Sequence, residues 1–197
     1  MPIRLCSVMV LVSFVSLFAP TSAASQQAAS AGTQDTFRAE VSLTVGQMTM
    51  APEGAGRRST FQGRCTRPAD WLISFPLEGE AAPLGHVTGW AEHCSTVVRW
   101  KTAGGQQVPD SLHYEDGRFF YATAAGDTLR GVYGNGRSGL NADQTLWFRD
   151  DYAFLGGTGR FELSTGGGSE SCTAFALDRG GVMRAEGTLR LRRSTTL

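Results

Sequence analysis

Hydrophobic and polar residues alternate along several short stretches of this chain. The clearest stretch runs from Phe37 to Val45, where every second residue is apolar. A repeat of two residues is typical of a β-strand that buries one face and exposes the other. Downstream of residue 24, no stretch shows a sustained 3.6-residue repeat bounded by helix-capping residues. The pattern therefore predicts an all-β chain.

Turn-forming residues divide the alternating stretches into about eight or nine expected strands. The strands are expected at residues 37–45, 59–65, 71–77, 86–98, 118–123, 128–133, 144–155, 169–177 and 182–191. Many short antiparallel strands joined by tight turns favour a barrel or a sandwich. Closure into a barrel also removes exposed strand edges. We therefore predict a single closed antiparallel β-barrel of about eight strands.

The first 24 residues have the features of a cleaved signal peptide. Arg4 ends a short basic start, residues 5–18 are apolar but too short to span a bilayer, and small residues at 21–24 suit a cleavage site. Residues 25–36 are rich in Ser, Ala and Gln and are expected to be a flexible lead. Residues 37–193 remain as the β-barrel domain. We therefore expect a secreted or periplasmic protein with no membrane attachment after signal removal.

The charges and cysteines narrow the picture further. The 18 basic and 18 acidic side chains balance, so we expect no nucleic-acid partner. Three cysteines remain after signal removal, and an oxidising compartment predicts one disulfide and one free thiol. All three pairings are open; we favour Cys65–Cys94 because these residues flank a single hairpin region. Cys172 lies in an alternating run and is expected to be a buried, inert thiol.

A glycine-rich corner at residues 156–161 is expected to join two strands. Glycine tolerates backbone torsions, including positive φ, that strain other residues. We therefore assign Gly156, Gly157 and Gly159 to a structural turn. With Phe154 and Leu155 before it, the corner reads Phe-Leu-Gly-Gly-Thr-Gly-Arg-Phe, and Ser-Thr-Gly follows at residues 164–166.

This corner resembles the Gly-Gly-Thr-Gly-x-Phe hairpin of the allene oxide cyclase and dirigent barrels, and more closely that of small exported bacterial proteins with the same type of barrel. Gly117–Gly131 is similar to their hairpin of an aromatic strand, an Ala-Ala-Gly-Asp turn and a second strand, and Leu84-Gly85-His86 resembles their Leu-Gly turn. The resemblance implies an eight-stranded, calycin-like barrel and a homo-oligomer. It carries over no catalytic residue, and the bacterial proteins have no assigned reaction.

Two patterns suggest cofactor or metal binding, but the sequence around each of them argues against it. Gly134–Gly139 fits G-x-G-x-x-G, but no helix follows it to bind a phosphate. We interpret this segment as a flexible loop. His86 and His93 are seven residues apart and therefore face opposite sides of one strand. We expect no cofactor and no metal.

Two acidic residues are candidates for a functional group inside the barrel. Glu92 shares a strand face with Trp90, and inside a barrel it would suit general acid or base chemistry. The alternative is that the opposite face, with Val87 and Ala91, points inward, and the alternation does not decide between the two. Asp150 lies on an apolar strand face, where a buried carboxylate needs a partner such as an arginine. The alternative, which we favour, is that Asp150 lies at a strand end or at a bulge.

Aromatic strand residues could also line a cavity, because eight-stranded barrels either fill with side chains or hold one small ligand. The candidate interior binding set is Trp71, Phe75, Trp90, Glu92, Phe148, Asp150 and Tyr152. We favour a non-catalytic module that binds a small apolar ligand or a protein partner, with no catalytic residue. A cyclase- or isomerase-type enzyme with an interior carboxylate and a structural or assembly protein stay open.

Overall fold

The computed structural model describes residues 33–51 and 60–191. The expected signal peptide (1–24) lies outside this range, as does the expected lead up to residue 32. Residues 33–36 were assigned to the lead, but they belong to the first strand and pair with residues 188–191. That part of the prediction was wrong because backbone pairing with β9, together with a hydrogen bond from Arg190 Nε to Gln34 Oε1, holds these polar residues in the sheet.

The described chain consists mainly of β-strands in an all-antiparallel arrangement. The strands are β1 (Thr33–Leu43), β2 (Gln47–Met50), β3 (Trp71–Ala82), β4 (Gly85–Ala103), β5 (Gln106–Thr123), β6 (Thr128–Leu140), β7 (Leu146–Gly157), β8 (Thr165–Phe175) and β9 (Gly181–Leu191). Two short 3-10 turns are also present, η1 (Phe61–Gly63) and η2 (Gly159–Phe161). None of the helical segments in the described ranges is long and apolar enough to cross a membrane.

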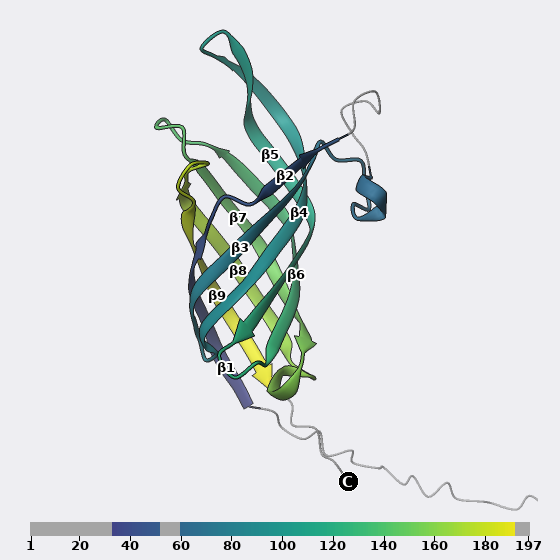
Figure 1. Ribbon diagram of the computed structural model, residues 1–197, viewed down its shortest axis with the longest axis vertical. Helices are drawn as coiled ribbons and strands as arrows, with labels where there is room; N and C mark the ends of the chain where they lie inside the picture. Colours follow the sequence, from purple (N-terminus) through teal and green to yellow (C-terminus); the bar gives the residue numbers. More distant parts are fainter. Residues whose placement is uncertain (1–32, 52–59, 192–197) are drawn as a thin grey trace, which may run out of the picture.

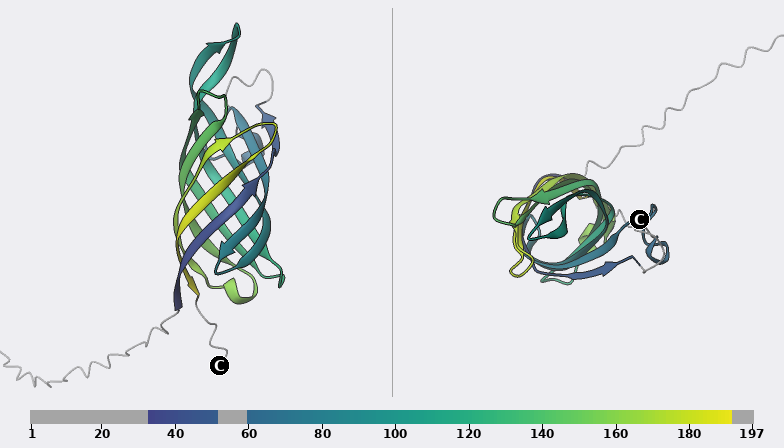
Figure 2. Two further views of the ribbon diagram at one scale, coloured as in Figure 1. Left: turned by 90° about the vertical axis from the view of Figure 1, so that its left-hand side faces the viewer. Right: turned by 90° about the horizontal axis from the view of Figure 1, so that it is seen from above.

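Eight of the strands close into a barrel (Figure 1). Strands β3 to β9 follow one another around the sheet, and β1 pairs with both β9 and β3 to complete the ring. The end-on view in Figure 2 shows this ring directly. The short strand β2 pairs with the first residues of β3 and is additional to the eight. The predicted closed antiparallel barrel of about eight strands is confirmed.

Two local predictions were wrong. The described part of the expected strand at 59–65 contains η1 instead. Gly134–Gly139 lies within β6 and is not a flexible loop, because β5 pairs with it on one side and β7 on the other. Gly136 is directly opposite Tyr114, and a Cβ at Gly136 would lie 1.9 Å from that ring. Its glycine leaves room for a neighbouring aromatic side chain.

The glycine-rich corner joins β7 to β8 and contains η2. Gly156 and Gly159 have φ of +85° and +55°, a region that other residues rarely adopt. Gly157 is needed for space, because a Cβ there would lie 1.7 Å from the carbonyl oxygen of Thr128. These contacts place the corner against the start of β6, at the end of the barrel where both described termini lie (Figure 1).

The same end of the barrel is filled by tightly packed side chains. Phe37 is fully buried, and its ring packs edge-on against Phe154 with centroids 4.9 Å apart. Phe161, from η2, is 1% exposed and belongs to the same hydrophobic cluster. Leu129 and Leu189 are also fully buried. This end therefore has a solid core, which anchors the strands that continue toward the opposite end.

Cys65 and Cys94 form a disulfide, the pairing that the sequence favoured, and Cys172 is a buried free thiol. With Ala69 and Leu72, the disulfide forms a small cluster separate from the main core. Both neighbours of Cys94 on β4 line the barrel interior, so Cys94 points outward. The disulfide therefore fastens the segment before β3 to the outside of the barrel.

Replacing both disulfide cysteines with alanine is expected to lower the free energy of unfolding by about 3–4 kcal/mol. The bond closes a loop of 29 residues, and its loss increases the conformational entropy of the unfolded chain. Urea unfolding followed by tryptophan fluorescence measures the change. Cys172→Ala is the control, because it keeps the bond and is expected to cost only about 1 kcal/mol. An unchanged unfolding midpoint in the double variant would contradict this prediction.

Candidate functional site

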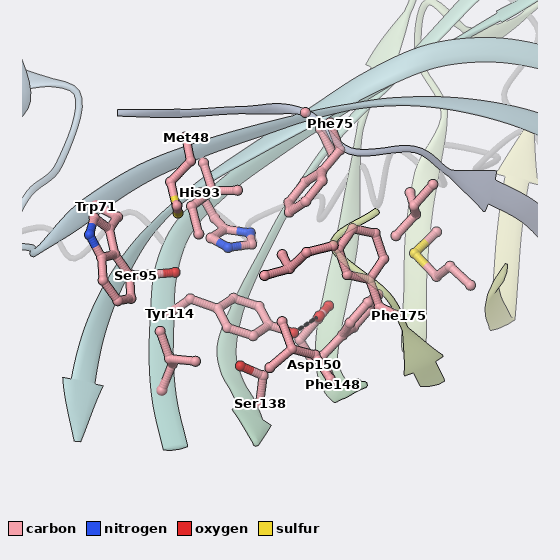
Figure 3. Close-up of a pocket in the computed structure, with 18 of the residues that line it drawn as sticks. Met48, Trp71, Phe75, His93, Ser95, Tyr114, Ser138, Phe148, Asp150 and Phe175 are labelled. Carbon is pink, nitrogen blue, oxygen red and sulfur yellow. Dashed lines mark hydrogen bonds between the residues drawn. The ribbon is translucent and has the colours of Figure 1, made fainter. Parts of the chain in front are cut away.

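The half of the barrel opposite η2 is hollow. A cavity of about 510 Å³ lies there, walled mainly by apolar side chains from the strands (Figure 3). It reaches Val45, Met48 and Leu177, which lie at the barrel rim and are 50%, 53% and 66% exposed. A ligand can therefore reach the cavity from solvent at this end.

The structure brings together four of the seven candidate interior residues. Trp71, Phe75, Phe148 and Asp150 line the cavity. Tyr152 is buried on the same face of β7, but it belongs to the main core, where it packs against Phe154 with ring centroids 5.2 Å apart. It does not line the cavity.

Trp90 and Glu92 face the outside of the barrel, so their placement in the interior was wrong. Val87 belongs to the main core and His93 lines the cavity, and the residues that alternate with them on β4 point outward. Trp90 is 37% exposed and packs edge-on against Phe120. The error arises because both faces of β4 mix aromatic, polar and small residues, so alternation does not identify the buried face.

Five polar side chains meet on the cavity wall: His93, Tyr114, Tyr133, Asp150 and Glu170. We call this group the inner polar cluster. Its members come from five successive strands, β4 to β8. Asp150 and Glu170 are directly opposite each other on β7 and β8, and they are 6% and 9% exposed. The barrel therefore holds two buried carboxyl groups side by side.

Hydrogen bonds and ring contacts hold the cluster in place. The Tyr114 hydroxyl donates a hydrogen bond to Asp150 Oδ2, drawn as a dashed line in Figure 3. The Nδ1 atom of His93 lies 2.9 Å from the Tyr133 hydroxyl oxygen. The His93 ring stacks on Tyr114 with centroids 4.4 Å apart. Asp150 lies within β7 and not at a strand end, and its neighbours are a phenol and a second carboxyl group in place of an arginine.

Burial sets the protonation of the cluster. It raises the pKa of Asp150 to about 6, against the opposing effect of hydrogen bonds from Tyr114 and Glu170. Burial, followed by the charge of Asp150, raises the pKa of Glu170 well above its usual range. Burial also lowers the pKa of His93 to about 3, so its imidazole is neutral at pH 7. At neutral pH, which is above the raised pKa of Asp150, the pair carries negative charge, while the raised pKa of Glu170 favours its protonated form.

One carboxyl oxygen of this pair lacks a donor. Asp150 Oδ1 is buried and has no hydrogen bond within the described chain. Glu170 lies close enough to the Asp150 carboxyl group to lower its pKa by hydrogen bonding, but Oδ1 itself has no hydrogen-bond partner among the described residues. A buried acceptor without a donor costs about 1–3 kcal/mol. A ligand that supplies a donor at this position would recover that energy.

The sequence candidates did not include His93, Tyr114, Tyr133 or Glu170. For Glu170 a weak signal exists: it lies two residues before Cys172, an expected buried position, and therefore shares its strand face. For the tyrosines, the signal is the glycine opposite each ring. Tyr114 pairs with Gly136 and Tyr133 with Gly117, but these pairs can be recognised only once the strand register is known.

Comparisons with known proteins add one similarity of overall shape. No family model matches the chain. No curated protein matches it either. Among solved structures, the chain is similar to a pterocarpan synthase dirigent protein, with 16% sequence identity and a TM-score of 0.42, over 84% of this chain and 87% of that chain. The assignment of a closed barrel rests on the strand pairing of this chain.

Proposed function

We propose that the protein binds a small, mostly apolar molecule inside the barrel and does not transform it. The observation that carries this proposal is the cavity of about 510 Å³, which reaches exposed residues at the rim. Small-molecule sites usually have volumes of about 300–1,000 Å³, apolar walls and a few polar groups that orient the ligand. The inner polar cluster supplies such groups here.

The size of the cavity also gives an expected affinity. An aromatic ring that leaves water buries about 150–250 Å², and each Å² of apolar surface contributes about 25 cal/mol. For a two-ring ligand, the gain of about 8–12 kcal/mol is reduced by the lost translational and rotational freedom. We therefore expect dissociation constants of about 1–100 µM for simple two-ring ligands.

Fluorescence titration with N-phenyl-1-naphthylamine tests the binding function. This uncharged, non-basic probe brightens when it leaves water. The expected result is a saturable increase with one probe per barrel and a dissociation constant of about 1–100 µM. A folded sample that gives no saturable signal would refute the proposal.

We also propose that the protein acts outside the cytoplasm. The Cys65–Cys94 disulfide supports this location, because such bonds persist in oxidising compartments. The expected signal peptide remains a prediction, and so does the homo-oligomer.

The carboxyl pair favours one alternative function, a cyclase- or isomerase-type enzyme. An ionised Asp150 beside a protonated Glu170 could act as base and acid on a bound molecule. A cyclic β,γ-unsaturated ketone tests this alternative, because proton transfer converts it into the conjugated isomer, which absorbs in the ultraviolet. The binding function predicts equal rates with the natural protein and Asp150→Asn. A rate that depends on Asp150 would support the enzyme.

A further inference from the structure

We propose that the cavity selects lipophilic amines, whose ammonium group binds at the paired carboxyl groups of Asp150 and Glu170 while the apolar part fills the hollow end of the barrel. This inference rests on the proposed binding function and names its ligand class. It depends on three features: the negative charge of the carboxyl pair, the acceptor Asp150 Oδ1 that has no donor, and the aromatic side chains around the pair.

The charge that the cavity lining can carry at neutral pH is negative. Asp150 and Glu170 are the acidic groups among its described lining residues, and none of those lining residues is Arg or Lys. The two carboxyl groups are at least nine-tenths buried and directly opposite each other. Buried charges in proteins are normally paired with an opposite charge. This pair has no such partner within the cavity.

The other titratable groups near the pair do not supply a positive charge. They are His93 on β4, Tyr114 and Tyr121 on β5, Tyr133 on β6, Asp151 and Tyr152 on β7. Burial keeps His93 neutral. The tyrosines are neutral because burial raises their pKa values. Asp151 is exposed on the outer face of β7 and adds further negative charge. The carboxyl pair would therefore attract a cation inside the cavity, and none of these neighbouring groups supplies a competing positive charge.

An ammonium group also satisfies the unpaired acceptor. It carries three N–H donors, so it can donate to Asp150 Oδ1, which has no donor of its own, and to Glu170 at the same time. An alcohol could donate to Oδ1, but it would leave the negative charge of the pair unbalanced. The chemistry of the pair thus favours an amine over an alcohol of the same shape.

The walls around Asp150 suit the rest of such a molecule. Tyr114, Phe148 and Phe175 surround it in Figure 3, and all three line the cavity. Aromatic faces attract cations, by about 2 kcal/mol where water is excluded. Further from the pair, Leu146 and Met183 continue the apolar lining. The ligand class is therefore a primary or secondary amine with an apolar ring system.

A matched pair of ligands tests the selection. 2-Naphthylmethylamine and 2-naphthylmethanol have nearly the same shape, and each can displace N-phenyl-1-naphthylamine at pH 7.5. We expect the amine to bind about tenfold more tightly or better. In Asp150→Asn/Glu170→Gln, the amine should lose this advantage while the alcohol keeps its affinity within about threefold. Glu92→Gln removes an outward carboxylate on the neighbouring part of the sheet and should change neither value.

A pH series with the natural protein gives the same test without a substitution. Burial raises the pKa of Asp150 to about 6. Below that pH, the carboxyl pair gains its second proton and loses its negative charge. The preference for the amine should therefore shrink as the pH falls from 7.5 to 5. Equal or tighter binding of the alcohol at pH 7.5, or a preference that survives in the double variant, would overturn the inference. If neither ligand displaces the probe and the probe itself does not bind, the binding function fails as well.

Discussion

Tryptophan at positions 91 and 138 is expected to abolish measurable binding of the naphthylamine probe and to leave the barrel folded. Ala91 and Ser138 lie on β4 and β6, and both side chains line the cavity. Two indole rings would occupy much of the 510 Å³ that a ligand needs. We expect Ala91→Trp/Ser138→Trp to weaken probe binding by about 100-fold or more, which is about 2.7 kcal/mol. Fluorescence titration measures the affinity, and circular dichroism checks the fold.

The matched control places the same rings on the outside of the same strands. Thr88 on β4 and Arg137 on β6 are exposed, so Thr88→Trp/Arg137→Trp should bind the probe as the natural protein does. Probe binding that survives in the folded cavity variant would place the ligand elsewhere. The outward-facing pair of Trp90 and Phe120, whose ring centroids are 5.6 Å apart, would then be the next surface to examine.

Phe37→Ala is expected to lower the free energy of unfolding by about 3–5 kcal/mol, the usual cost of removing a large buried aromatic side chain. Phe37 is fully buried. Its ring centroid lies 6.4, 5.9 and 4.9 Å from those of Tyr121, Tyr152 and Phe154. The surrounding barrel strands cannot collapse far enough to refill the space. Urea unfolding at constant temperature gives the difference.

Phe120→Ala removes the same side chain from the outer face of β5 and should cost about 1 kcal/mol or less. The two variants together test where the core lies. If Phe37→Ala and Phe120→Ala had equal effects, the solid core at the η2 end would be wrong. Probe binding should be retained by folded Phe37→Ala, since Phe37 does not line the cavity.

Alternation was a good guide where one strand face is uniformly apolar. In β1, Phe37, Ala39, Val41 and Leu43 are all buried and the residues between them are exposed. The same logic placed Asp150 correctly on the inner face of β7. Such strands need no long-range information, because their own pattern decides which face the core covers.

The interior of the barrel was harder to predict because it is not uniformly apolar. On β4 the inner face includes His93 and Ser95, whereas Cys94 on the outer face is buried under the segment that its disulfide fastens. Burial on both faces therefore interrupts the alternation. Glu170 follows a run of glycine and serine, and only the weak signal of Cys172, two residues later, indicates its orientation. Its position opposite Asp150 depends on the register between β7 and β8, which short-range patterns do not determine.

The most direct test is a crystal structure of the protein grown with 2-naphthylmethylamine. Electron density for one amine should lie within the eight-stranded ring, with its nitrogen within hydrogen-bond distance of Asp150 Oδ1 and its rings between the aromatic walls. A barrel interior packed solid with side chains, or an amine bound only on the outer surface, would contradict the account.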